Sequence, residues 1–437
     1  MRRLVRSENY KKETNVLNSK NSRAFYNYVN AKLVSRDNIP TLKSGNRLAE
    51  TPSTKASFLS EQFKSVFTLD DGSLPEFPAK TNATISEVDI TVEKVYKVLR
   101  KLPNKVSCGP DGIPQVLLKN VALEITLPLT LIFRRSFDSG ILPNDWLQAI
   151  IIAIFKRKGA NSCPANYRPV SLTSVCCKIF ETLLKEALLD YLFSKGLINR
   201  AQHGFLKLRS TLTNLFETFG KWLKAVDQRK FVHAVYIDFA KAFDSVSHPK
   251  LLHKLKAYGI AGKLLTWISA FLSNRSQRVK VGDSLSNPAE VLSGVPQGSV
   301  LGPILFLLYI IDLPDEIRTC EIKMFADDVK IYTISDDRIE CPVLSEGLEI
   351  VHRWSTVWQL SLAVAKCSVT VFGGPPVEDA AYRIGGQALE YKKEVKDLGV
   401  WVGNDLKFSK QARGLVEKRY LLVHEFFGHL RRATEVF

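Results

Sequence analysis

Two adjacent aspartates interrupt an apolar stretch that otherwise has the pattern of a β-hairpin. They are Asp327 and Asp328, in the segment MFADDVKIYT. Apolar and β-branched residues flank the pair, so two strands are expected with the acidic residues at the turn between them. Neighbouring carboxylates repel each other, and both stay ionised only where cations or hydrogen-bond donors compensate them. A divalent metal is one such compensation. A simple polar turn, in which Asp is common, is the alternative.

A third aspartate repeats this pattern upstream. Phe231 to Ile237 is an apolar run typical of a buried strand, and Asp238 follows it directly. If the two strand ends lie side by side, Asp238, Asp327 and Asp328 form a cluster of three carboxylates. Magnesium prefers such hard oxygen ligands and shares its coordination with water and substrate phosphates. Two such ions can activate an attacking hydroxyl and stabilise the leaving oxygen in phosphoryl transfer.

Further short motifs occur in a fixed order along the chain. They are CGPDGIP (Cys108 to Pro114), IIAIFKRKG (Ile151 to Gly159), NYRPVSLTSVCCKIFE (Asn166 to Glu181), QHGF (Gln202 to Phe205), SGVPQGSVLGPILF (Ser293 to Phe306), AKC (Ala365 to Cys367) and VKDLGV (Val395 to Val400). Together with the acidic motifs, this order resembles the reverse transcriptase of non-LTR (LINE-like) retrotransposons of the jockey and CR1 type. The resemblance implies an RNA-directed DNA polymerase with two Mg²⁺ ions, or Mn²⁺ as a substitute, as cofactors.

The resemblance also implies an α+β fold, that of a right-hand polymerase with fingers, a palm whose antiparallel sheet is backed by helices, and a partial thumb. The expected parts are an N-terminal helical extension and linker (1–84), fingers and the start of the palm (85–230), the palm with its catalytic motifs (231–403) and a partial thumb or C-terminal tail (404–437). The reverse transcriptase domain as a whole is expected over about residues 140–403.

Roles for single residues follow from the matching motifs. The implied catalytic residues are Asp238, Asp327, Asp328 and Lys366, and the implied metal ligands are Asp238, Phe239, Asp327 and Asp328. The implied nucleotide-binding residues are Lys156, Arg168, Phe243, Gln297 and Gly298, and the implied primer-binding residues are Leu398 and Gly399. One position departs from the family, which commonly has Asn where this chain has Ala363.

Several of these residues also have plainer interpretations. Arg168 suits a triphosphate because a guanidinium grips phosphate oxygens with two donors. In the basic triplet that begins at Lys156, a solvated turn is an equally good interpretation of Arg157 and Lys158. Phe243 follows Asp238 by five residues, where the family's aromatic packs under the sugar and excludes a 2′-hydroxyl; one more core Phe is the alternative. His203 is expected to make a structural contact, since no serine or aspartate partner is apparent.

Composition favours a nucleic-acid partner. The chain has 437 residues and a net charge of +17, from 61 Lys and Arg against 44 Asp and Glu, which suits a polyanion. No apolar run reaches membrane-spanning length, and no secretory signal is visible, so a nuclear or cytoplasmic location is expected rather than secretion. The expected partners are an RNA template, a DNA primer and dNTPs. An endonuclease activity is expected to be absent from this chain and to be supplied from elsewhere.

Seven cysteines in scattered positions predict free thiols rather than disulfides or a zinc site.

Two other functions fit parts of this pattern. The first is an inactive or co-opted retroelement protein that binds nucleic acid without synthesis. The second is a polymerase palm that copies another kind of template, such as a group II intron maturase or a telomerase, although the extra domains of either are not visible.

At the level of elements, we expect one helix over Val116–Ser136 and a basic hairpin near residues 273–291 with Arg275, Arg278 and Lys280 outward.

Overall fold

The computed structural model describes residues 39–339, 341–374, 382–414 and 416, and these form two compact units. The first unit contains the described residues 39–65 together with Ala149–Leu172 and Ser276–Glu290. The second unit contains Val66–Gln148, Thr173–Arg275 and the described residues from Val291 to 416. Each unit is therefore assembled from segments far apart in the sequence.

The first unit is a helix packed on a small sheet. Its hairpin β1 (Leu42–Ser44) and β2 (Arg47–Ala49) leads into α3 (Pro52–Lys64), which begins with a capping box at Thr51. The sheet has the order β4 (Tyr167–Leu172), β3 (Gln148–Phe155), β6 (Ser276–Val281) and β7 (Ser284–Leu285), and β8 (Ala289–Glu290) also pairs with β6. Apolar residues such as Leu59, Ile151 and Val279 are buried between the helix and the sheet.

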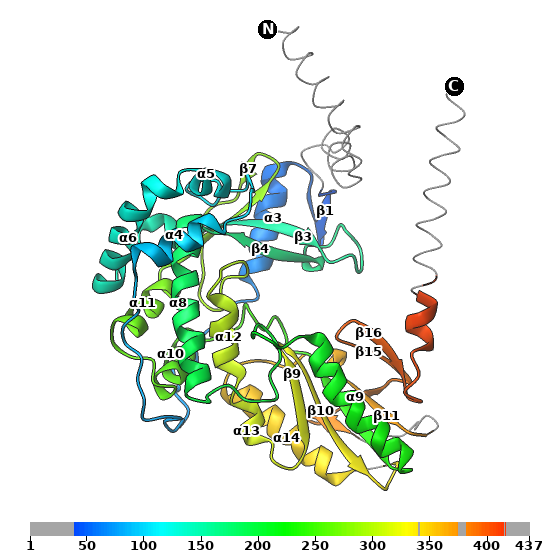
Figure 1. The fold of residues 1–437 in the computed structure, drawn as a ribbon. Coiled ribbons are helices and arrows are strands. Elements are labelled where there is room, and N and C mark those ends of the chain that lie inside the picture. Colours follow the sequence, from blue (N-terminus) through cyan, green and yellow to red (C-terminus); the bar gives the residue numbers. More distant parts are fainter. Residues whose placement is uncertain (1–38, 340, 375–381, 415, 417–437) are drawn as a thin grey trace, which may run out of the picture. The chain divides into compact units, whose positions relative to one another are not determined.

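A five-stranded sheet organises the second unit (Figure 1). Its strand order is β14 (Glu390–Tyr391), β11 (Ser368–Phe372), β5 (Phe231–Ile237), β10 (Asp328–Ser335) and β9 (Glu321–Phe325). The pair β11–β14 is parallel, and the other neighbours are antiparallel. The central strand β5 thus places its carboxyl end beside the start of β10.

Alternation along β5 assigns the two faces of this sheet to different helices. Val232 and Ala234 pack with Trp222 of α9 (Thr211–Asp227), whereas Val235 and Ile237 belong to the large core that includes α14 (Pro342–Val357). Because successive side chains of a strand point to opposite faces, a run that is buried at nearly every position, as β5 is, must be covered on both sides. Helices on both faces therefore fix the register that determines where Asp238 and Asp328 lie.

Helices make up most of the rest of the second unit. They are α4 (Val92–Arg100), α5 (Gln115–Asn120), α6 (Ala122–Ser139), α7 (Asn144–Leu147), α8 (Val175–Ser194), α10 (His248–Ala257), α11 (Gly262–Leu272), α12 (Gly302–Ile310) and α13 (Leu313–Glu316). The smaller elements are the hairpins β12 (Arg383–Ile384) with β13 (Gln387–Ala388) and β15 (Glu394–Asp397) with β16 (Val400–Gly403), and the 3₁₀ turns η1 (Pro164–Asn166, in the first unit) and η2 (Val364–Lys366). None of the described helices is long and apolar enough to cross a lipid bilayer.

The structure corrects two expectations about elements. The predicted single helix over Val116–Ser136 is instead the pair α5 and α6, because the chain leaves helical geometry at Val121 (φ −102°, ψ 26°). Arg275 does not point outward: it is 3% exposed and donates to the carbonyl of Phe271, while Arg278 and Lys280 are exposed as predicted. Arg275 is two residues before the buried Gln277, so the alternation of β6 directs it to the buried side, opposite to Arg278 and Lys280. All seven cysteines are free, as predicted.

Candidate active site

The acidic pair lies where β9 turns into β10. Phe325 pairs with Asp328, so Ala326 and Asp327 form the connection and Asp328 is the first residue of β10. Ala326 is buried and has a backbone φ of +57°, in the left-handed region that residues with a Cβ rarely adopt. This tight turn holds the two carboxylates next to each other.

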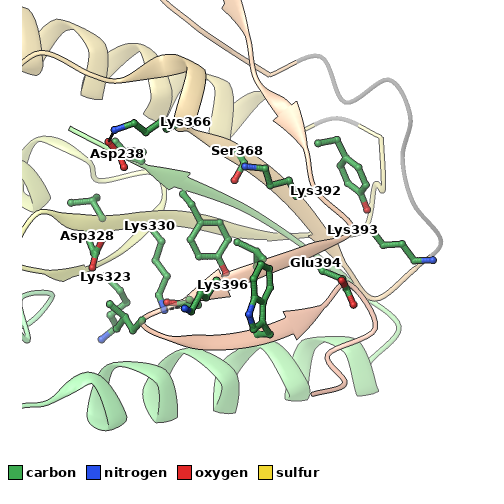
Figure 2. Close-up of a pocket in the computed structure, with 18 of the residues that line it drawn as sticks. Asp238, Lys323, Asp328, Lys330, Lys366, Ser368, Lys392, Lys393, Glu394 and Lys396 are labelled. Carbon is green, nitrogen blue, oxygen red and sulfur yellow. Dashed lines mark hydrogen bonds and ion pairs between the residues drawn. The ribbon is translucent and has the colours of Figure 1, made fainter. Parts of the chain in front are cut away.

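Asp238 lies beside this pair. Ile237 of β5 is paired with Val329 of β10, so the next position on each strand brings Asp238 next to Asp328. Lys366, at the end of η2, extends toward Asp238, and its Nζ lies 3.2 Å from Oδ1 of Asp238 (Figure 2). The structure therefore brings together three carboxylates and one lysine from separate motifs. Their catalytic roles remain a prediction.

The electrostatics of this cluster are those of crowded anions. Desolvation raises the pKa of Asp328 to about 6, and the charges of Asp327, Asp238 and Asp397 act in the same direction. Although the side chain of Asp328 is exposed at the start of β10, the protein around it still keeps part of the water away from its carboxyl group. Lys330 opposes this shift only partly. At neutral pH the crowded carboxylates therefore repel one another, the condition under which such a cluster recruits a cation.

A metal ion at this cluster would need further ligands besides the three carboxylates. No three His, Cys, Asp or Glu side chains of the described residues are arranged as a complete metal-binding group. Magnesium usually takes one or two carboxylates and completes its octahedron with water and substrate phosphates. The crowded carboxylates match that requirement. Phe239, which was predicted as a further ligand, directly follows Asp238 and forms an isolated β-bridge with Leu362.

The cluster borders a cavity of about 840 Å³ within the second unit. Lysines dominate its charged lining, and Figure 2 shows several of them around Asp238 and Asp328. The lining lysines are Lys323, Lys330, Lys366, Lys392, Lys393, Lys396 and Lys410. A cavity that has Asp238 and Asp328 at one side and more lysines than carboxylates in its lining suits a ligand that carries phosphates and is bound partly through a cation.

The hairpin β15–β16 is anchored to the sheet by a buried ion pair. Lys330 Nζ of β10 lies 2.6 Å from Asp397 Oδ2, and the side chains are 5% and 4% exposed. Tyr236 of β5 also donates to Asp397. The predicted primer-binding residues Leu398 and Gly399 follow at once, both with positive φ (44° and 94°), and form the tip of the hairpin. Lys330 and Asp397 were not predicted as site residues, although both lie inside motifs that the resemblance used.

Three predicted nucleotide-binding residues of the second unit lie near each other. Phe243 stacks on Phe306 with ring centroids 4.4 Å apart, and its carbonyl accepts from Val295 at 2.8 Å. Gln297 Nε2 donates to Asp244 Oδ1 at 2.9 Å, and Gly298 follows with a φ of +123°. The segment that carries Gln297 and Gly298 is therefore fastened to the loop after Asp238.

The two predicted nucleotide contacts in the first unit lie on neighbouring strands. Arg168 of β4 is paired with Ile154 of β3, and Lys156 follows β3 with its Nζ 2.8 Å from the carbonyl of Ala165. Both side chains are exposed.

His203 makes structural contacts, as expected. Its Nδ1 lies 2.9 Å from Thr213 Oγ1, and its backbone N–H donates to the carbonyl of Met324. Burial, together with the charge of Lys323, lowers the pKa of His203 to about 4, so the imidazole is neutral at physiological pH. A proton-transfer role near neutrality would require a pKa closer to the working pH.

Fold and site together define the class of protein: an α+β protein whose acidic cluster, beside a lysine-rich cavity, is suited to metal-assisted phosphoryl transfer. The chain belongs to the reverse transcriptase (RNA-dependent DNA polymerase) family, whose model matches residues 155–402. This match includes every site residue predicted above. Members of this family generally use divalent metal ions. The family and the α+β class predicted from the order of the motifs are thus confirmed.

Similar curated proteins come from fruit-fly mobile elements. The chain is 28% identical to a probable RNA-directed DNA polymerase from transposon BS of Drosophila melanogaster, over 79% of this chain and 39% of the relative. It is 29% identical to the RNA-directed DNA polymerase from mobile element jockey of the same species, over 77% of this chain and 37% of the relative. The chain is 27% identical to the probable RNA-directed DNA polymerase from transposon X-element, also of that species, over 76% of this chain and 38% of the relative. The chain thus spans less than two fifths of the length of these relatives.

Proposed function

We propose that this chain is an RNA-directed DNA polymerase that extends a primer 3′-hydroxyl with dNTPs on an RNA template, as in target-primed reverse transcription by a non-LTR retrotransposon. The observation that carries the proposal is the side-by-side placement of Asp238 and the Asp327–Asp328 pair at a lysine-lined cavity. Carboxylates placed in this way can hold divalent ions beside phosphates. Membership of the reverse transcriptase family supports the same reaction.

Asp238, Asp327 and Asp328, with Phe239 beside them, would hold two Mg²⁺ ions, with Mn²⁺ as a substitute. When bound, such ions activate the attacking hydroxyl and neutralise charge on the leaving oxygen. Lys366 would supply the cation for the leaving pyrophosphate. Its pair with Asp238 is exposed, 68% at the lysine and 44% at the aspartate, and exposed pairs of this kind are held weakly. Lys366 is therefore available to a phosphate when one arrives.

The remaining site residues would bind the nucleotide and the primer. We assign Lys156 and Arg168 to the triphosphate, and Phe243, Gln297 and Gly298 to the sugar and base. Phe243 is half-buried and backed by Phe306, so its ring is held in place firmly enough to exclude a 2′-hydroxyl by contact. Leu398 and Gly399 would contact the primer from the tip of the anchored hairpin.

In this proposal the five-stranded sheet with its helices is the palm of a right-hand polymerase. The part at 231–403 would carry the catalytic motifs, 85–230 would supply the fingers and the start of the palm, 1–84 would be an extension and linker, and 404–437 a partial thumb. Of these parts, residues 1–38 and 417–437 lie outside the described residues. The partners would be an RNA template, a DNA primer and dNTPs, with the DNA nick made by a separate endonuclease activity. Chromosomal DNA as the target would require entry into the nucleus after synthesis in the cytoplasm.

A primer-extension assay with purified protein tests this proposal. An RNA template with an annealed DNA primer, dNTPs and Mg²⁺ should yield extended DNA. Asp327→Asn should lose about three orders of magnitude in rate, on the order of 4 kcal/mol of barrier, because one charge at the metal site is removed. The wild-type protein and Asp327→Asn should bind the primer–template with similar affinity. A wild-type protein that binds but adds no nucleotide would favour the inactive or co-opted binding protein instead.

A further inference from the structure

The turn that carries Asp327 is held by contacts from a distant segment, residues 201–204. Ala326, directly before Asp327, has a φ of +57°, which costs free energy for any residue with a Cβ. The three carboxylates around the turn also repel one another, since the charges of Asp327 and Asp238 both act on Asp328. Backbone strain and charge repulsion both favour opening of the turn, so an external restraint is needed.

Gln202 provides a restraint at the strained residue itself. Its Oε1 accepts the backbone N–H of Ala326 at 2.9 Å and that of Gly204 at 2.7 Å. The side chain is 0% exposed, so no water competes for these hydrogen bonds. Its Nε2 is buried and has no hydrogen-bond partner among the described residues. The oxygen of Gln202 therefore makes all the polar contacts of this side chain that the structure describes.

The backbone around Gln202 is fastened to β9 on both sides. Met324 donates to the carbonyl of Ala201 at 2.9 Å, and His203 donates to the carbonyl of Met324 at 2.9 Å. A Cβ on Gly204 would lie 2.4 Å from the backbone nitrogen of Ala326, so only glycine permits this approach. The segment therefore lies against the turn without space for it to shift.

We propose that Gln202 is a positioning residue that holds Ala326 in its left-handed conformation and thereby aims Asp327 and Asp328 at the cation and substrate. The inference rests on the proposed polymerase function for its catalytic readout. It assigns Gln202 no contact with substrate. A misplacement of about 1 Å in a catalytic group can cost about 10²-fold in rate, so a single hydrogen bond at this turn has a large effect.

The test compares Gln202→Met with Thr218→Val. Methionine has nearly the shape of glutamine but no acceptor oxygen. Thr218 is also 0% exposed and donates one buried hydrogen bond, to the carbonyl of Asn214 in α9. Gln202→Met loses two buried hydrogen bonds and Thr218→Val loses one, so both variants should lose thermal stability and Gln202→Met should lose more. Only Gln202→Met should lower kcat, by about 10²-fold, and raise the Mg²⁺ concentration for half-maximal rate, with little change in KM for dNTP.

Two readouts do not depend on turnover. Hydrogen exchange at the amide of Ala326 should lose protection in Gln202→Met and keep it in Thr218→Val. Binding of Mn²⁺ to the protein without substrates, followed by electron paramagnetic resonance, should weaken in Gln202→Met alone. If wild-type protein adds no nucleotide, the polymerase proposal fails, and these two measurements still decide the role of Gln202.

Either of two results would overturn the inference. In the first, Gln202→Met retains wild-type exchange at Ala326 and wild-type Mn²⁺ binding. In the second, Gln202→Met and Thr218→Val change rate and stability in parallel, which would mean that Gln202 contributes only to the stability of the fold.

Discussion

At the residue scale, the surroundings of Asp328 change the pKa of its carboxyl group. Its pKa is raised to about 6 from an ordinary value of 3.8, first by desolvation and then by the charges of Asp327 and Asp238. A carboxyl whose pKa is raised on folding binds protons better in the folded state. The folded state therefore loses stability as the pH rises from about 4 to about 6, and the full penalty is present above that range.

This linkage predicts a stabilising mutation. In the absence of divalent metal, Asp328→Asn should have a higher Tm than the wild-type protein at pH 7.5, because the variant lacks the repelled charge. The difference should shrink as the pH falls through about 6 and vanish near pH 4, where Asp328 is protonated in the folded state. Thermal melts across this pH range provide the measurement. Added Mg²⁺ should also narrow the gap, and a gap that is independent of pH would contradict its attribution to the Asp328 charge.

At the scale of elements, the hairpin β15–β16 is attached beside Asp328 by a buried ion pair, in addition to the apolar packing of Val395 and Val402. Lys330 and Asp397 are both almost fully buried, and Lys330 also lies 5.7 Å from the ring centroid of Trp222. Desolvation lowers the pKa of Lys330, and the charge of Asp397 acts against that shift. A charge that loses its only strong partner in such a place is very costly.

A double-mutant cycle measures this attachment. Lys330→Met should destabilise the protein by about 3–5 kcal/mol, because it leaves the Asp397 carboxylate buried without its cation. Lys330→Met with Asp397→Leu should recover most of that loss, since an apolar pair replaces both charges. Denaturant unfolding gives the four free energies. If the losses of unfolding free energy in Lys330→Met and in Asp397→Leu alone add up to the loss in the double variant, the ion pair does not couple the hairpin to the sheet.

The elements differ in how well the sequence predicts them. The strand predicted over Phe231–Ile237 has its observed bounds, because a buried central strand is apolar at nearly every position, with His233 as the polar exception. The ion pair of Lys330 with Asp397 and the hydrogen bond of Gln202 to Ala326 were not predicted. Each joins residues far apart in the chain, and their side chains are polar, the kind usually interpreted as exposed. Only the packing of strands and loops shows that they are buried.

At the scale of the whole molecule, the net charge of +17 has a consequence that can be measured. Binding of a nucleic-acid duplex releases condensed counterions, so the logarithm of the binding constant falls linearly with the logarithm of salt concentration, by about 0.9 per neutralised phosphate. The slope therefore counts phosphate contacts, and removal of a lysine that makes such a contact lowers it.

The lysines of the cavity provide the last prediction. Lys393 and Lys396 are exposed and line the cavity, whereas Lys97 and Lys101 are exposed at α4 and do not line it. If primer–template binds at the cavity, changing Lys393 and Lys396 to Gln should reduce the slope by about 1.4–1.8, from about 0.7–0.9 per contact. The Lys97→Gln, Lys101→Gln control carries the same change in net charge. Fluorescence anisotropy over a range of KCl concentrations gives both slopes, and equal slopes would mean that long-range charge, rather than contact at the cavity, governs binding.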